Sequence, residues 1–563
     1  MGGSNMSLMG FMMKMMAHIG QKYVKQLEKM TKDPLGVQTE ILMSVLDENK
    51  DTEYGRKYGF SEIHSIEEYQ KRLPICEYDD YAPYIERMVK GEDNVLVKEH
   101  VTHFNKTSGT LGLAKHIPLS KRHTAVCGKY FALHSGAHIS NQIGYGWTNG
   151  KGINLVEGRA EVLESGATYG AASSVMHKKG PLKNFTGKLY TSPLEARNPG
   201  PGYLTRYIHT RFALMERNVT YIQGTFSSII MEFFTYIMHN HEMLINDIEK
   251  GTIDEDVNLP DSVKASLLTQ IKPNPARAAE LRAAFADGID TPWAKKVWKN
   301  LQYILTVGGA NFSPYTDKMK KNILGSEVHV FYLGVSASEG FFSTHYKMDE
   351  SPSILVPDGC FMEFLPQDEE NAECITMDKL EKDKCYEVIL TGFGGLYRYR
   401  MHDVIRVVGF HNKTPLIEFE TRAGYAANLR GEKTSEKAVR HAVLETEKRL
   451  CFDLVDYSIY PDADAEVPTY VIFLELNKRP EGLDDETIRA CLQEELIKAN
   501  SGLAKHFGEG HLAPVKLVIL QPETYMLYRE VMIMKGASAS QLKPINLVRN
   551  EFQRKFLFGL EEK

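Results

Sequence analysis

The chain has 563 residues, which is long enough for two or more domains with a hydrophobic core in each. Hydrophobic residues make up 43% and charged residues 25%, the balance of an ordinary globular protein, and a net charge of -6 gives no reason to expect nucleic-acid binding. Seven scattered cysteines without a CxxC pair argue against a secreted disulfide framework, and no apolar run reaches the length of a transmembrane helix. We therefore expect a cytoplasmic protein without a membrane span.

Residues 8 to 90 have the pattern of helices joined by short loops. The stretch from Met6 to Ile19 is rich in methionine, but Lys14 and His18 interrupt it and no basic residue precedes it. These features disfavour a signal peptide. We interpret the stretch as a helix whose methionines pack on the main body.

Residues 100 to about 200 are predicted to mix strands and loops, and they contain the glycine-rich stretch Thr107 to Lys115. Its hydroxyls, accessible backbone N–H groups and ammonium are donors suited to phosphate oxygens, and they belong to Ser108, Gly109, Thr110 and Lys115. The stretch is not a Walker A loop, because alanine precedes the lysine where glycine is required. A phosphate-binding loop and a plain polar connection both fit this pattern.

Residues 203 to 300 are predicted to be mainly helical, and the apolar runs Leu301 to Val307 and Val328 to Leu333 to be buried strands, followed by a strand at Cys385 to Thr391. Ser338 and Glu339 follow the second run. A hydroxyl and a carboxylate at a strand end can hold a phosphate and a divalent cation together, since Mg²⁺ is usually bound by one or two carboxylates with phosphates and waters. The alternative is a turn with an exposed glutamate.

The most informative stretch runs from Gly395 to Phe410. Tyrosines alternate with arginines from Tyr397 to Arg400, the pattern of a half-buried strand, and Val404 to Phe410 is a second apolar run. We predict two strands joined at a tight polar turn, with Asp403 at the turn. A carboxylate there can accept hydrogen bonds from a sugar diol.

Strands interleaved with helices predict α/β layers in most of the chain. After residue 423 the pattern changes to a smaller set of elements: a helix at Glu432 to Leu450, a strand at Val467 to Leu476, a helix at Leu483 to Ala499 and a strand at Val515 to Leu520. We therefore predict a large layered α/β domain over residues 1–423 and a small α+β domain over residues 424–563.

Together these stretches resemble the motifs of the GH3 family of acyl-acid amido synthetases, a branch of the adenylate-forming enzymes that also include acyl-CoA ligases and luciferases. Thr107 to Lys115 is similar to the phosphate loop of that superfamily, and Gly334 to Gly340 to its Tyr-x-Ser-Ser-Glu motif. Gly395 to Phe410 resembles Tyr-Arg-x-Gly-Asp-Val. Near the end, Gly536 to Lys543 resembles the family's Gly-Ala-Ser-x-Asn-Gln-Tyr-Lys.

The resemblance implies an ATP-dependent ligase that forms an acyl-adenylate from a carboxylic acid and passes the acyl group to an amine, in this family usually an amino acid. It also implies a large domain that binds ATP and the acid, and a small C-terminal domain that rotates over it. Glu339 would hold Mg²⁺, Asp403 would accept from the ribose hydroxyls, and Lys543 would reach the α-phosphate and carboxylate oxygens. The remaining implied ATP-binding residues are Ser108, Gly109, Thr110, Lys115, Ser338 and Arg422.

Two positions depart from the family's motifs. Val335 stands where tyrosine is usual, which removes an aromatic stacking surface for adenine, and His402 stands where glycine is usual. We interpret His402 as an exposed turn side chain, with an imidazole acting beside Asp403 as the alternative. We therefore expect an amido synthetase and keep two alternatives: an acyl-CoA ligase, and a non-catalytic GH3-like binding or scaffold protein.

Overall fold

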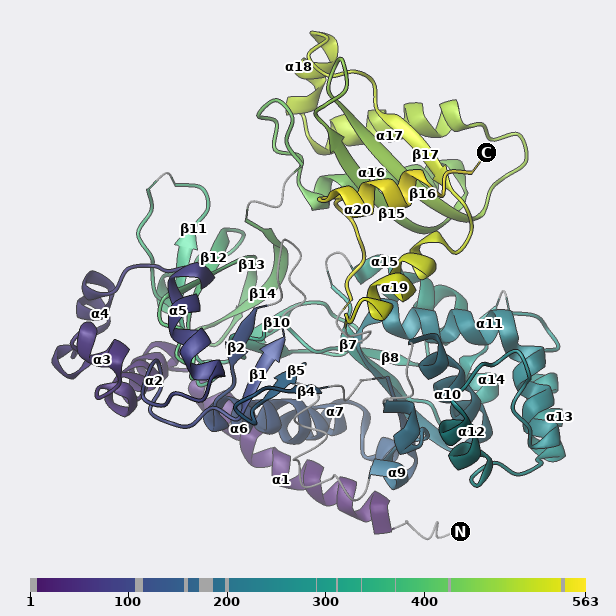
Figure 1. The fold of residues 1–563 in the computed structure, drawn as a ribbon, viewed down its shortest axis with the longest axis horizontal. Helices are drawn as coiled ribbons and strands as arrows, with labels where there is room; N and C mark the ends of the chain where they lie inside the picture. The colour runs from purple at the N-terminus through teal and green to yellow at the C-terminus, as the bar shows by residue number, and fades with distance from the viewer. Residues whose placement is uncertain are drawn as a thin grey trace. The chain divides into compact units, whose positions relative to one another are not determined.

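The computed structural model describes residues 8–106, 115–155, 160–171, 186–197, 202–289, 291–309, 312–335, 337–369, 371–423, 427–537 and 542–562. These residues form two compact units, which divide between Phe419 and Glu420 (Figure 1). We call them the larger and the smaller unit. The predicted domain boundary between residues 423 and 424, and a hinge there, stay predictions.

The larger unit begins with helices, as predicted for residues 8 to 90. They are α1 (Leu8–Met30), α2 (Pro34–Asn49), α3 (Glu53–Lys57), α4 (Ile66–Arg72) and α5 (Tyr78–Val89). A side-chain oxygen accepts a backbone N–H and caps the start of α2, α3 and α4, at Asp33, Thr52 and Ser65 respectively. Sequence-local capping therefore sets where these helices begin.

Helix α1 packs on the larger unit as predicted: Met13 lies against a hydrophobic core, and Gly20 lets the helix backbone approach its neighbour closely. A Cβ atom at Gly20 would stand only 1.9 Å from the backbone oxygen of Leu133. Leu133 belongs to a π-helical turn, η2 (Gly128–His134), which lies between α6 (Lys121–Cys127) and α7 (Ser135–Ile143). These three helical segments correct the prediction of only strands and loops for residues 100 to 200. Packing against α1 stabilises η2 and α7 where their His-, Gly- and Ser-containing sequence does not favour a helix, and α6 packs in turn against η2.

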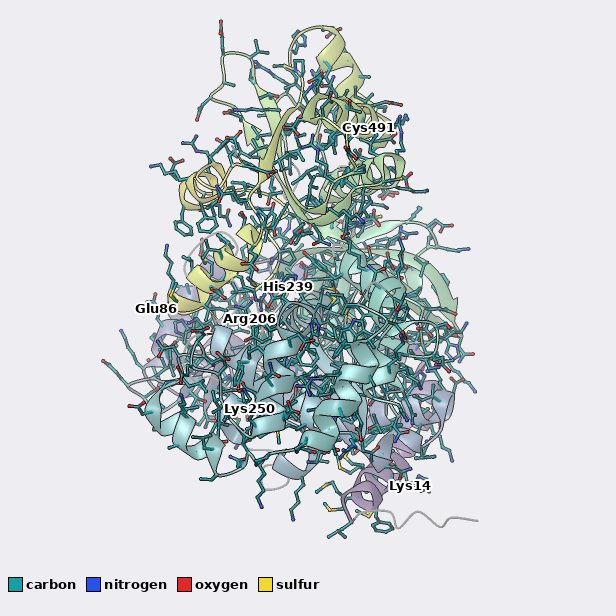
Figure 2. The ribbon with its side chains drawn as sticks, turned by 90° about the vertical axis from the view of Figure 1, so that its right-hand side faces the viewer. Lys14, Glu86, Arg206, His239, Lys250 and Cys491 are labelled. Carbon is teal, nitrogen blue, oxygen red and sulfur yellow. The ribbon has the colours of Figure 1, made fainter. Side chains whose placement is uncertain are left out.

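A parallel sheet forms one part of the larger unit, with the strand order β3-β6-β7-β8. Its strands are β3 (Lys151–Asn154), β6 (Val219–Phe226), β7 (Tyr303–Val307) and β8 (His329–Tyr332). The two buried strands predicted from the sequence are β7 and β8. A hydrophobic core joins this sheet to a group of helices (Figure 1) that includes α10 (Gly202–Met215), α11 (Ser227–Lys250), α12 (Asp261–Leu268), α13 (Pro275–Phe285), α14 (Ala294–Val297) and α15 (Ser313–Met319). Lys250, labelled in Figure 2, ends α11.

Two further sheets share a second core with helices α2 to α5. A six-stranded sheet has the order β11-β12-β13-β14-β10-β9, formed by β9 (Ser343–His345), β10 (Ser353–Leu355), β11 (Phe361–Pro366), β12 (Cys385–Thr391), β13 (Tyr399–His411) and β14 (Thr414–Arg422). A four-stranded mixed sheet has the order β2-β1-β5-β4, formed by β1 (His103–Lys106), β2 (His116–Pro118), β4 (Ala160–Val162) and β5 (Thr168–Gly170). Strand β12 has the bounds predicted from the sequence.

The smaller unit is a three-stranded sheet with helices, as predicted for an α+β unit. Its strands are β15 (Asp453–Asp462), β16 (Thr469–Lys478) and β17 (Lys516–Leu520). Its helices are α16 (Glu436–Leu450), α17 (Asp485–Ala499), α18 (Gly502–Gly508), α19 (Thr524–Met534) and α20 (Glu551–Phe558). Along β16, Ile472 lies in the core with α16 and α17, and Phe473 lies in the core with α19 and α20. The alternation buries both faces of the central strand.

None of the described helices combines the length and the apolar character needed to cross a membrane.

Three histidines lie together inside the larger unit: His134 in η2, His138 in α7 and His345 in β9. The ring centroid of His138 lies 5.5 Å from that of His134 and 4.7 Å from that of His345, and the centroids of His134 and His345 are 6.0 Å apart. Burial lowers the pKa of His138 and, together with His138 and Lys129, lowers that of His134 to about 3. It also lowers the pKa of His345 well below the usual 6.5. The folded protein therefore keeps rings neutral that the unfolded chain protonates.

The larger unit is expected to lose stability as the pH falls below 6.5, because only the unfolded chain then binds these protons. Replacing His134 by asparagine removes one such ring. Between about pH 6 and about pH 4, lowering the pH should therefore reduce the free energy of unfolding of both proteins. The reduction should be about 1.4 kcal/mol per pH unit smaller for His134→Asn than for the wild type. Urea unfolding followed by tryptophan fluorescence measures this, since Trp147, Trp293 and Trp298 all belong to the larger unit.

The exposed His64 provides the control. His64→Asn should keep the wild-type dependence on pH. Equal slopes for His134→Asn and the wild type would contradict the assignment of His134 as a buried neutral ring.

Candidate active site

The predicted turn around Asp403 is a bulge within one strand. Strand β13 runs without a break from Tyr399 to His411, so the prediction of two strands joined by a turn is wrong. Arg400 pairs with Ile389 and Val404 pairs with Glu387, so the three residues 401–403 of β13 face the single residue 388 of β12. His402 takes the left-handed backbone conformation within this bulge, with φ +65. Bulges of this kind bend a strand and redirect its side chains, often beside active sites.

A buried carboxylate lies beside the bulge. Glu387 of β12 accepts hydrogen bonds from Nε and Nη2 of Arg400, at 2.8 and 2.9 Å, and its Oε1 lies 3.3 Å from Nδ1 of His402. Burial opposes ionisation, but the hydrogen bonds from His402 and Arg400 outweigh it and hold the pKa of Glu387 at about 2. Glu387 is therefore a carboxylate at neutral pH, fully paired within the protein.

The ring of His402 has a second acidic neighbour. Its Nε2 lies 3.3 Å from Oε1 of Glu77, the residue that precedes helix α5. Only about a third of the His402 side chain is exposed. The interpretation of His402 as an exposed turn side chain is therefore wrong, because both ring nitrogens face carboxylates.

The side chain of Lys115 lies against the beginning of strand β13. Its Nζ is 3.3 Å from the hydroxyl of Tyr399 and 5.0 Å from the ring centre of Tyr78 in α5. The Tyr78 hydroxyl also accepts the backbone N–H of His116 at 2.9 Å. These contacts bring the end of the first predicted motif to the start of the third.

The second predicted motif lies between β1 and the end of β12. Asn105, buried at the end of β1, donates from Nδ2 to the backbone oxygen of Ser338 at 2.9 Å. A Cβ atom at Gly392, just after β12, would stand 2.7 Å from the backbone oxygen of Glu339. Glycine is therefore required there, since the turn with Ser338 and Glu339 approaches the end of β12 too closely for a side chain.

Val335 sits at the start of this second motif. Its backbone N–H donates to Oγ of Ser343 at 2.6 Å, and that hydroxyl donates to the Val335 oxygen at 2.8 Å. The Val335 side chain is partly buried against the core of the sheets. The structure thus has an aliphatic contact where the family's motif has an aromatic ring.

The other predicted site residues lie elsewhere in the chain. Arg422 ends β14, the neighbour of β13 in the sheet. Lys543 belongs to the smaller unit. Ser108, Gly109 and Thr110 fall outside the described residues.

The contacts join parts of three motifs around β12 and β13. The sequence analysis predicted Lys115, Ser338, Glu339 and Asp403 for this site. It missed the residues that hold them in place: Glu77, Tyr78, Asn105, Glu387, Gly392 and Arg400. An ammonium, a glutamate and an aspartate in one region can serve the phosphates, a divalent cation and the sugar of a nucleotide.

Three family models match consecutive parts of the chain. The GH3 family N-terminal domain matches residues 23–328, the GH3 family central domain residues 353–422, and the GH3 family C-terminal domain residues 436–551. A jasmonoyl–L-amino acid synthetase, GH3.5 of Oryza sativa subsp. japonica, is 24% identical over 93% of this chain and 94% of its own length. A 4-substituted benzoates-glutamate ligase, GH3.12 of Arabidopsis thaliana, is 25% identical over 96% of this chain and 97% of its own.

Solved structures share the fold. The GH3.15 acyl acid amido synthetase superimposes with a TM-score of 0.84 at 20% identity, covering 96% of both chains. A 2-hydroxyisobutyryl-CoA ligase in its postadenylation state superimposes with a TM-score of 0.52 at 11% identity, covering 93% of this chain and 90% of its own. The chain therefore belongs to the GH3 family of acyl-acid amido synthetases, which confirms the family, the layered α/β fold and the ligase class predicted from the sequence.

Proposed function

We propose that this chain is an ATP-dependent acyl-acid amido synthetase that converts a carboxylic acid to its acyl-adenylate and then joins the acyl group to an amine, here an amino acid. One observation carries the proposal. The contacts from Lys115 to Tyr399 and from Asn105 to Ser338 bring parts of three nucleotide motifs to one region of the larger unit. An amino acid as the acceptor is supported by the names of two relatives, a jasmonoyl–L-amino acid synthetase and a 4-substituted benzoates-glutamate ligase.

The chemistry explains why ATP is needed. A carboxylate cannot acylate an amine directly, because oxide would have to leave. Attack of the carboxylate oxygen on the α-phosphorus of ATP breaks the bond to the β-phosphate bridge and releases pyrophosphate. The amine then attacks the acyl carbonyl, loses a proton and expels AMP. The enzyme must hold two anions together, a task of positioning and electrostatic stabilisation.

The residues of the larger unit, together with Arg422 just beyond its boundary at the end of β14, are proposed to bind the nucleotide. Asp403 would accept from the ribose hydroxyls, and Arg422 would make a second nucleotide contact. The phosphates would be bound by Ser108, Gly109, Thr110, Lys115 and Ser338.

Mg²⁺ is proposed to bind at Glu339. A single carboxylate that follows a strand, beside a phosphate-binding hydroxyl, is a donor set that suits Mg²⁺, which keeps several waters and takes oxygens from substrate phosphates. When bound, the ion would offset the repulsion between ATP and the carboxylate. Among the described residues no group of three histidine, cysteine or acidic side chains is arranged for a metal ion. Glu339 is the protein ligand that the proposal names.

Lys543 is proposed to act from the smaller unit. Its ammonium would approach the α-phosphate and carboxylate oxygens during adenylation, through the rotation of the C-terminal domain that the family resemblance implies. We also propose a cytoplasmic location, which the seven cysteines support because all of them are free thiols.

Lys543→Ala should strongly slow adenylation while leaving the fold intact. Wild-type protein with ATP, Mg²⁺ and a panel of carboxylic acids should release pyrophosphate only with an accepted acid, and amino acids should allow turnover to an amide. Removing the ammonium that faces developing charge should lower the rate by about 10²-fold or more. Pyrophosphate release and mass spectrometry of the products measure both steps.

Lys555→Ala is the matched control, because Lys555 is an exposed lysine of the smaller unit that pairs with Glu551. It should keep the wild-type rate. Thioester formation with coenzyme A would instead indicate an acyl-CoA ligase. Absence of pyrophosphate with every acid, together with no effect of ATP on the melting temperature, would support a non-catalytic binding protein.

Glu339→Gln should raise the Mg²⁺ concentration needed for half-maximal pyrophosphate release, by about tenfold or more, because a neutral amide binds a hard cation more weakly than a carboxylate. A titration of Mg²⁺ at saturating ATP and acid measures this. Glu381→Gln, which changes an exposed glutamate paired with Lys384, is the control and should not shift the curve. An unchanged Mg²⁺ dependence in Glu339→Gln would remove Glu339 from the proposed metal site.

A further inference from the structure

His402 occupies a backbone position that normally favours glycine. Its φ of +65 lies in the left-handed region, which a side chain with a Cβ atom adopts only at a cost. The residue is also the middle one of the three that form the bulge opposite residue 388. A glycine would take this conformation without strain, so the presence of histidine calls for contacts that compensate.

Such contacts exist on both sides of the ring. Nδ1 lies 3.3 Å from Oε1 of Glu387, and Nε2 lies 3.3 Å from Oε1 of Glu77. Glu387 is fixed in turn by its two hydrogen bonds from Arg400. The imidazole therefore links strand β12, the bulge in β13 and the beginning of α5, and a glycine would make none of these links.

The backbone on one side of the bulge is fixed as well. The N–H of Cys76 donates to the oxygen of Arg398 at 3.1 Å, and the N–H of Arg400 donates to the oxygen of Cys76 at 2.8 Å. The residue before Glu77 is thus paired with the start of β13. The remaining freedom of the bulge lies at residues 401 to 403, where the ring of His402 is held between the two carboxylates.

We infer that His402 is a positioning residue, which fixes the bulge so that the carboxylate of Asp403 accepts hydrogen bonds from the ribose of ATP. The inference rests on the proposed function. Asp403 follows His402 directly, so a rotation about the backbone of His402 moves the aspartate. The contacts of the ring with Glu77 and Glu387 restrict that rotation. Selection for the ribose hydroxyls therefore depends on these two glutamates as well.

The test compares binding of ATP with binding of 3′-deoxy-ATP, using equilibrium titration so that no acid substrate is needed. The wild type should prefer ATP, and Asp403→Asn should reduce that preference. His402→Ala should do the same, weakening ATP about tenfold while binding of 3′-deoxy-ATP changes little, because the lost contact is a hydrogen bond to the sugar. His402→Asn should recover part of the preference, since asparagine tolerates this φ and its amide can donate to Glu387.

His402→Gly separates positioning from relief of strain. It removes the ring and also the unfavourable conformation, so it should fold at least as well as His402→Ala and still lose the preference for ATP. His411→Ala is the matched control, because His411 lies on the same strand and its Nε2 pairs with Glu28 at 2.6 Å. It should bind both nucleotides as the wild type does.

A preference for ATP in His402→Gly and His402→Ala equal to that of the wild type would overturn the inference while the proposed function stands. Failure of the wild type to bind ATP would instead overturn the proposed function, and the inference with it.

Discussion

One buried ion pair fixes the start of the strand on which the proposed site depends. Arg398 donates from Nε and Nη2 to the two carboxylate oxygens of Glu363 on β11, at 3.0 and 2.9 Å. Its Nη1 donates to the backbone oxygens of Gln70 and Leu73 at the end of α4, at 2.8 and 2.7 Å. A buried ion pair is tolerated only when its remaining groups are hydrogen-bonded, and loss of one partner leaves an unpaired charge. The backbone of Arg398, with φ +48 and its N–H bound to Thr391, therefore has little freedom to move.

The site follows from this anchor. Beyond Arg398, strand β13 begins at Tyr399, which contacts Lys115, and continues to the bulge at Asp403. Asn105 of β1 holds the turn with Ser338, and Gly392, just after β12, allows the same turn to approach closely. Nucleotide chemistry is thus proposed at a place where rigid strands set the backbone and polar contacts set the side chains, which is the arrangement that electrostatic preorganisation requires.

The sequence predicts the local properties of this site and not its long-range partners. Strand β12 has its predicted bounds, because an apolar run is a local signal. The polar residues before Asp403 correctly mark an irregularity, but whether it is a turn or a bulge depends on β12, which continues alongside it. Glu77 and Asn105 come from the first part of the chain, and no spacing or propensity indicates that they meet residues near 400 or 338. Helix α7 was missed for a similar reason, because packing on α1 decides its conformation.

The central claim is that the acid is activated as an acyl-adenylate. The most direct measurement uses an accepted acid whose two carboxylate oxygens are both ¹⁸O, together with ATP, Mg²⁺ and an amino acid, and follows where the label goes. Because a carboxylate oxygen becomes the bridge to the α-phosphorus and leaves with it, the account predicts one ¹⁸O in each AMP and the other in the amide. Label in inorganic phosphate, with ADP as the nucleotide product, would contradict the account, since it would mean that the γ-phosphate and not the α-phosphate is attacked.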